Sequence, residues 1–163
     1  MNEIQTALFQ KKNEPYKTFM AKLLPNVAPE KIIGVKVGDI RKIAQKLDAK
    51  TSQAFLSELP HTYLEEEYLH TFLLKKKHAQ LDEIERFLPY VNNWAVCDSF
   101  PVFDWEKESE IWMKWLDSHH PYTIRYAIVN LIKKTKIFTI LARSSGPSAK
   151  PGILCQHGDC LVF

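Results

Sequence analysis

Hydrophobic and polar positions alternate along the chain with the three-to-four-residue spacing of amphipathic helices, and no alternating strand pattern appears before residue 137. Pro15 and Pro121 suit the first turn of a helix, Pro60 separates two helices, and Thr51 is the expected N-cap of another. The pattern predicts helices over residues 2–12, 14–24, 37–48, 51–58, 62–77, 80–91, 93–99, 106–117 and 121–135. Paired helices with short connections favour an all-α fold, a HEAT-like α-solenoid (α–α superhelix) with degenerate repeats.

The pattern changes near residue 137. Residues 138–163 hold only three charged residues but three of the five glycines, and residues 144–152 have the composition of a linker. We therefore expect a HEAT-like helical-repeat domain over residues 1–137 and an irregular tail over residues 138–163. Cys155, His157 and Cys160 of this tail have ligand-like spacing, but no fourth ligand is identifiable and no metal site is predicted.

Composition narrows the classes of function. No run of eighteen apolar residues is present, so no membrane span is predicted, and Met1–Lys12 lacks the apolar core of a secretory signal. The three cysteines do not have the spacing of a zinc ribbon, and a reducing cytoplasm is the expected compartment. A net charge of +3 permits binding to nucleic acid without arguing for it.

Basic residues gather in two stretches of the chain. Six lie between Lys31 and Lys50, and Lys42, Lys46 and Lys50 recur every four residues, which predicts one helical face. The second stretch contains Arg125, Lys133, Lys134 and Lys136. A charge run by itself favours a solvated helix face, and a surface for nucleic acid is the alternative.

The most distinctive segment runs from Leu88 to Ser99. If a helix begins at Asn93, Trp94 and Asp98 lie four residues apart and share a face. An indole beside a carboxylate suits a cationic substrate, because the ring offers a π surface and the carboxylate a negative charge. The structural alternative is that Trp94 belongs to the core and Asp98 caps a turn or pairs with a lysine.

Two further segments hold candidate polar residues. Arg125 stands among apolar residues near the start of its helix, where it can bind a phosphate, pair with Asp98 or extend its guanidinium to solvent. Glu66 and His70 lie four residues apart in the segment 61–70. This spacing is not the two-histidine pattern of a metalloprotease, so a hydrogen-bonded contact between helices is favoured over a ligand set.

Four segments taken in order resemble the DNA alkylation-repair family typified by AlkD: Gly34–Lys42, Leu59–Glu66, Asn93–Ser99 and Tyr122–Val129. The resemblance covers about residues 14–135. It implies an all-helical HEAT-like solenoid whose basic concave face holds duplex DNA. It also implies a glycosylase, expected to act as a monomer and without a cofactor, on cationic N-alkylated purines such as 3-methyladenine and 7-methylguanine.

The resemblance assigns roles residue by residue. The family's catalytic aspartate falls on Asp98, the tryptophan one turn earlier on Trp94, and the arginine of a later helix on Arg125. The family's early tyrosine has no match, because Leu23 or Leu24 occupies that region, and its last tryptophan would lie in a further helix. We therefore expect a chain that is C-terminally truncated or altered. The residues expected to contact DNA are Lys36, Arg41, Lys42, Lys46, Lys133 and Lys134.

The sequence thus predicts a monofunctional DNA glycosylase that hydrolyses the N-glycosidic bond of alkylated purines. Asp98 would stabilise the oxocarbenium-like state, Trp94 would pack against the lesion nucleotide, and Arg125 would bind a phosphate. One alternative is a non-catalytic HEAT-repeat module that binds nucleic acid or protein. Another is a defective product of a repair gene whose uncapped last apolar face promotes dimerisation.

Overall fold

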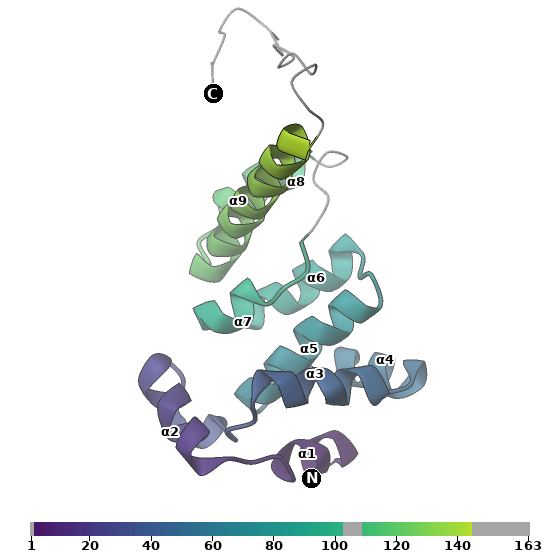
Figure 1. Cartoon of the computed structure of the whole chain (residues 1–163), viewed down its shortest axis with the longest axis vertical. Coiled ribbons are helices and arrows are strands. Elements are labelled where there is room, and N and C mark those ends of the chain that lie inside the picture. The colour runs from purple at the N-terminus through teal and green to yellow at the C-terminus, as the bar shows by residue number, and fades with distance from the viewer. Residues whose placement is uncertain (1, 103–108, 145–163) are drawn as a thin grey trace, which may run out of the picture. The chain divides into compact units, whose positions relative to one another are not determined.

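The computed structural model describes residues 2–102 and 109–144, and all regular elements in these ranges are helical, which confirms the predicted all-α class (Figure 1). Two compact units divide the chain, Met1–Asn130 and Leu131–Phe163. The first unit contains all candidate site residues except two lysines, Lys133 and Lys134. The superhelical arrangement of repeats stays a prediction.

The helices lie close to their predicted ranges. They are α1 (Glu3–Phe9), α2 (Glu14–Leu23), η1 (Pro29–Lys31), α3 (Val37–Lys46), α4 (Ala49–Ser57), α5 (Leu64–Lys76), α6 (Leu81–Phe87), η2 (Leu88–Tyr90), α7 (Trp94–Asp98), α8 (Ser109–Leu116) and α9 (Pro121–Ser144). Helix α9 continues beyond the predicted end at residue 135. Residues 145–163 of the predicted tail, including its three candidate metal ligands, lie outside the described residues. The domain division at residue 137 stays a prediction.

The break between α3 and α4 differs from the prediction. Asp48, not Thr51, caps α4, because its carboxylate accepts the N–H of Thr51 at 2.9 Å. Leu47 and Asp48 have extended backbone angles, so α3 ends at Lys46. Lys50 therefore lies on α4, and the predicted single face of lysines spaced by four does not continue beyond Lys46.

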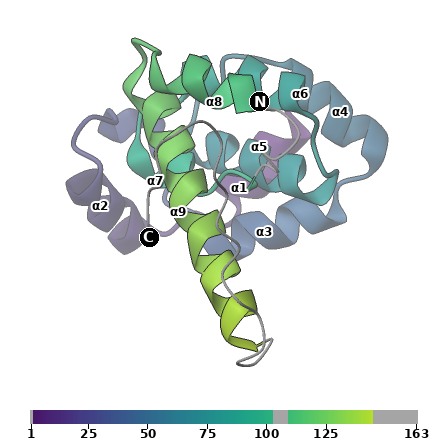
Figure 2. The same cartoon turned by 90° about the horizontal axis from the view of Figure 1, so that it is seen from above.

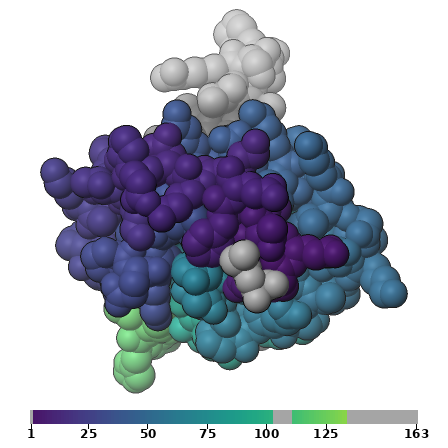
Figure 3. Space-filling view, turned by 90° about the horizontal axis from the view of Figure 1, so that it is seen from below, coloured from purple at the N-terminus to yellow at the C-terminus, as the bar shows by residue number. Residues whose placement is uncertain are grey.

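Helix α5 is the most buried element of the first unit. Its residues from Leu64 to Leu74 are buried except Glu67, which is half-buried. Such burial on all sides is typical of a central helix. It packs against α3, α4 and α7 (Figures 1 and 2). Seen from below, the surface is formed mainly by the N-terminal helices, coloured purple to blue (Figure 3).

A buried carboxylate ties the loop before α3 to α5. Glu65 is only 2% exposed and accepts the N–H groups of Ile33, Gly34 and Val35 at 2.9, 2.7 and 3.1 Å. Gly34 has a φ of 95°, and a Cβ there would lie 2.6 Å from the carbonyl oxygen of Asn13. These hydrogen bonds satisfy a buried charge and set where α3 begins.

The polar pair of the segment 61–70 makes structural contacts, as predicted. Glu66 accepts hydrogen bonds from the backbone of Thr62 and from the side chain of Gln5 of α1. His70 Nδ1 lies 2.8 Å from His61 Nε2. Within residues 2–102 and 109–144, no group of three His, Cys, Asp or Glu side chains is arranged to hold a metal ion. In these same ranges, no helix is long and apolar enough to cross a membrane.

Candidate functional site

Helix α7 begins at Trp94 and ends at Asp98, as the spacing predicts. Its start is capped by Asn93, which is fully buried and whose Oδ1 accepts the N–H of Val96 at 2.9 Å. The same side chain donates from Nδ2 to Glu67 Oε2 of α5 at 3.2 Å. The three residues between Trp94 and Asp98 are buried. The short helix is thus anchored along one side, and its two end residues are the more exposed ones.

Trp94 does not belong to the core. Its exposed fraction is 40%, which contradicts the structural interpretation of this residue. An indole that is held on a capped helix and yet open to solvent offers a flat surface to a ligand. Trp94 can therefore pack against a base or a sugar without a rearrangement of the core.

Asp98 pairs with Arg125 across α7 and α9. Arg125 donates from Nε to Oδ1 at 2.8 Å and from Nη2 to Oδ2 at 2.7 Å, a bidentate geometry. The hydrogen bond to Asp98 raises the pKa of the Arg125 guanidinium above its ordinary value. The side chains of Asp98 and Arg125 are 33% and 41% exposed, so the ion pair is open to solvent. Of the roles considered for Arg125, the pairing with Asp98 is the observed one.

Helix α5 supports α7 at both of its ends. The Glu67–Asn93 hydrogen bond lies at the start of α7, and the Thr71 and Ser99 hydroxyl oxygens lie 2.8 Å apart at its end. Tyr68 is buried between these contacts on α5. Burial raises the pKa of its hydroxyl, and the charges of Glu67 and Asp98 raise it further. Tyr68 therefore lies within electrostatic reach of the Asp98 carboxylate.

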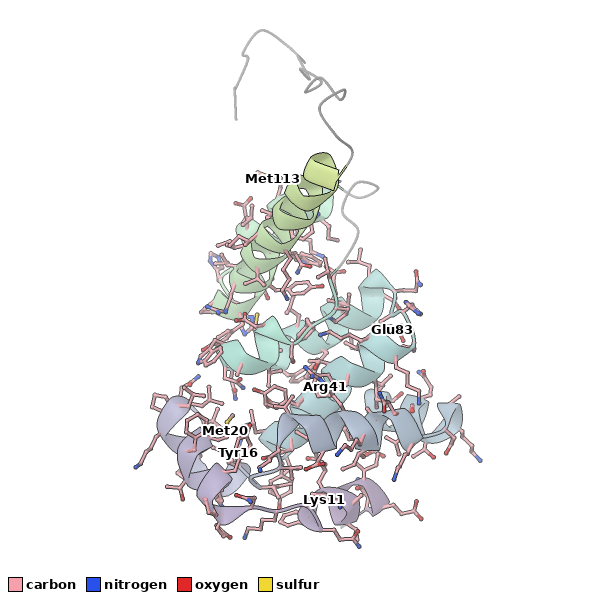
Figure 4. All side chains as sticks on the ribbon, in the orientation of Figure 1. Lys11, Tyr16, Met20, Arg41, Glu83 and Met113 are labelled. Carbon is pink, nitrogen blue, oxygen red and sulfur yellow. The ribbon has the colours of Figure 1, made fainter. Side chains whose placement is uncertain are left out.

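A basic groove lies between α3 and α5. Its volume is about 500 Å³, and its lining consists of Arg41, Ala44, Gln45, Phe72, Lys75 and Lys76. The guanidinium of Arg41 lies 5.1 Å from the centre of the Phe72 ring, and Lys75 Nζ lies 6.0 Å from it. Figure 4 shows Arg41 on the side of α3 that faces α5. Among the described residues, this lining has three cations and no carboxylate, which makes the groove attractive to anions.

Lys76 has a structural role in the same groove. Its Nζ donates to the carbonyl oxygens of Ala44, Gln45 and Leu47 at 3.1, 3.1 and 2.7 Å. These carbonyls end α3, so the ammonium group caps the helix and its dipole. Arg41 and Lys75, both near the Phe72 ring, are the other cations that line the groove.

One face of α5 connects the groove with the Asp98 region. Tyr68, Phe72 and Lys75 are spaced as neighbours on one helical face, and the rings of Tyr68 and Phe72 lie 6.2 Å apart. At the rise of an α-helix, Tyr68 and Lys75 are separated by about 10 Å along the axis. That length corresponds to about three nucleotide steps of one DNA strand.

The predicted DNA-binding residues are distributed differently. Arg41 lies in the groove, whereas Lys36, Lys42 and Lys46 are exposed on or just before α3. Lys42 Nζ lies 3.2 Å from Asp39 Oδ1. Lys133 and Lys134 lie on α9 but in the second compact unit, and the side chain of Lys134 is outside the described part of the chain.

Sequence reasoning missed two groups of residues. Phe72 and Lys75 were overlooked because a basic last turn is common in helices, although their spacing from Tyr68 could have indicated a shared face. Tyr16 was overlooked in the early helices, where Leu24 is buried and Leu23 is exposed. Tyr16 lies on the side of α2 that faces α3 (Figure 4). Burial raises the pKa of Tyr16.

Comparisons with known proteins identify the family of the chain. A family model described as "DNA alkylation repair enzyme" matches residues 3–144, a range that includes Trp94, Asp98 and Arg125. Searches of curated proteins and of solved structures found no match.

Proposed function

The chain belongs to the DNA alkylation repair enzyme family, and on this premise we propose that it is a DNA glycosylase for positively charged N-alkylated purines. The observation that carries the proposal is an exposed tryptophan and an oriented carboxylate at the two ends of one anchored helix. Trp94 supplies a π surface, and Asp98 supplies a carboxylate held by Arg125. Both suit a cationic nucleotide.

Beyond the negative charge of Asp98, the reaction needs little from the protein. Alkylation at N3 or N7 makes the purine cationic, so the base departs with the electron pair of the C1′–N bond and becomes neutral. Positive charge develops on the sugar, and the Asp98 carboxylate stabilises it. Water then adds to C1′ and loses a proton, which completes hydrolysis of the N-glycosidic bond. Asp98 would also orient this water.

Arg125 has two tasks in this scheme. Its hydrogen bonds hold both carboxylate oxygens of Asp98, which sets the direction in which the negative charge points. These two bonds use two of the five N–H groups of a guanidinium. The same side chain can therefore also bind a phosphate of the lesion strand, the role that the sequence predicts.

Duplex DNA binds through phosphate contacts in this proposal. The groove of Arg41 and Lys75 offers two cations beside an aromatic ring, about three nucleotide steps from the Tyr68 region. Such contacts give affinity that does not depend on base sequence and that falls with salt. The other predicted contacts of the first unit, from Lys36, Lys42 and Lys46, would extend this surface along α3. Contacts from Lys133 and Lys134 of the second unit are proposed separately.

The deciding experiment measures release of methylated bases from duplex DNA treated with a methylating agent. We compare the chain with Asp98→Asn, which keeps the size of the side chain and one oxygen for Arg125. Release of 3-methyladenine or 7-methylguanine by the chain and its loss in the variant support the glycosylase. DNA binding without release by the folded chain would instead support a non-catalytic module that binds nucleic acid.

A further inference from the structure

Helix α7 carries Trp94 and Asp98. The contacts that anchor this helix therefore determine the orientation of both side chains. Its N-terminal attachment is a relay of two hydrogen bonds, from the Val96 N–H to Asn93 Oδ1 at 2.9 Å and from Asn93 Nδ2 to Glu67 Oε2 at 3.2 Å. Asn93 is fully buried, so it has little freedom to exchange Glu67 for water. The Glu67 carboxyl group therefore ties the start of α7 to α5, while the Thr71–Ser99 hydrogen bond ties its end.

The contact with Asn93 needs only a hydrogen-bond acceptor, yet Glu67 provides an ionisable one. Burial raises its pKa to about 7, while the hydrogen bond from Asn93 and the charge of Lys31 act in the opposite direction. The carboxylates of Glu65 and Glu66 on the same helix raise this pKa as well. A glutamine would accept the same hydrogen bond without the cost of partly desolvating a charge. A carboxylate at this place makes the strength of the bond depend on its ionisation.

We propose that Glu67 is a positioning residue for Trp94 and Asp98 and acts on both through Asn93 and α7. This inference rests on the proposed glycosylase function. A charged acceptor makes a shorter and stronger hydrogen bond than a neutral one, so ionised Glu67 holds the start of α7 more firmly. Neutral Glu67 leaves the relay weaker and the two side chains less well oriented.

Base release should then depend on the ionisation of Glu67. We expect the single-turnover rate at saturating DNA to rise by about fivefold from about pH 6 to about pH 8. DNA affinity should change little over this range, because Glu67 does not line the basic groove. A separation of rate from affinity distinguishes positioning from a general loss of structure.

The experiment uses the full chain, Glu67→Gln and Glu67→Ala. Glu67→Gln keeps an acceptor for Asn93 but does not titrate, so its rate should be flat with pH and near the low-pH rate of the parent. Glu67→Ala removes the acceptor on α5 and leaves Asn93 Nδ2 with Asn92 Oδ1, 3.1 Å away. The tie between the two helices is then lost, and we expect a rate about tenfold lower than that of the parent at every pH. Glu58→Gln, a change at an exposed glutamate, is the matched control and should keep the parent profile.

The fluorescence of Trp94 provides a readout that does not require catalysis. The difference between the emission of the chain and that of Trp94→Phe should change with pH near neutrality in the parent and not in Glu67→Gln. Failure of the parent to release any base would refute the proposed function, while this pH-dependent emission would still report on α7. A parent-like rate profile and parent-like emission in Glu67→Gln would overturn the role of Glu67.

Discussion

Arg125 holds Asp98 through two parallel hydrogen bonds that join the end of α7 to the first turns of α9. The two residues are 27 positions apart in the chain. Asp98 is the last residue of a five-residue helix, so α7 alone does little to restrain its side chain. The direction of the carboxylate is therefore set largely from α9.

Replacement of Arg125 should impair base release through the orientation of Asp98. Arg125→Lys keeps the positive charge but cannot make the bidentate contact, and we expect release to fall by about tenfold. Arg125→Ala should lower it by about a hundredfold, because the carboxylate loses both hydrogen bonds. Single-turnover release from methylated duplex DNA measures both changes. A rate for Arg125→Lys equal to that of the parent would show that the paired geometry is not needed.

Trp94 should determine preference for alkylated over undamaged DNA. Loss of a cation–π contact of about 1–2 kcal/mol predicts a five- to thirtyfold smaller preference in Trp94→Leu, which keeps apolar bulk without a π surface. Trp94→Phe should retain only part of the preference, because phenylalanine keeps a π surface but has a smaller ring. Competition binding with methylated and unmethylated duplexes provides the measurement. Equal preference in Trp94→Leu and the parent would remove Trp94 from lesion recognition.

The basic groove should govern affinity and not chemistry. The double variant Arg41→Gln with Lys75→Gln removes two cations, so the slope of log affinity against log salt should become shallower by about two. Base release at saturating DNA should stay at the parent rate, because saturation compensates for the lost phosphate contacts. Lys11→Gln, a change of an exposed lysine on the loop after α1, is the control and should leave the slope unaltered. An unchanged slope in the double variant would place the DNA elsewhere.

The helices could be predicted from the sequence because they depend on local periodicity, and the placement of Trp94 and Asp98 on one short helix followed from their spacing. The end of α3 was missed because Asp48 and Thr51 are both good capping residues and local pattern does not choose between them. Contacts between segments that are distant in the chain could not be predicted from the local pattern either. The pairing of Asp98 with Arg125 was one of several options, and the contact of Arg41 with Phe72 was not foreseen.

Acid should destabilise the folded chain through a pair of histidines, the half-buried His61 and the buried His70. Burial lowers the pKa of His61 to about 4 and that of His70 to about 2, and the two rings share a hydrogen bond. The unfolded chain takes up these protons at the ordinary histidine pKa, about 6.5. Stability is therefore complete above about pH 6.5 and falls as the pH decreases below it, by up to about 1.4 kcal/mol per pH unit for each histidine.

Glu67 changes the pH dependence of stability in the direction opposite to that of the histidines. Variants at the two sites should therefore shift the acid loss of stability in opposite directions. The pKa of Glu67 is raised to about 7 in the folded chain, so folding favours the neutral carboxyl group. Its contribution to stability is therefore present at low pH and is lost as the pH rises through 7. Urea unfolding at several pH values should show a steeper acid loss in Glu67→Gln than in the parent. The double variant His61→Phe with His70→Phe keeps ring packing against Phe55 and Phe87 and should show a shallower loss. If the double variant lost stability in acid as steeply as the parent, the histidine pair would not be the cause.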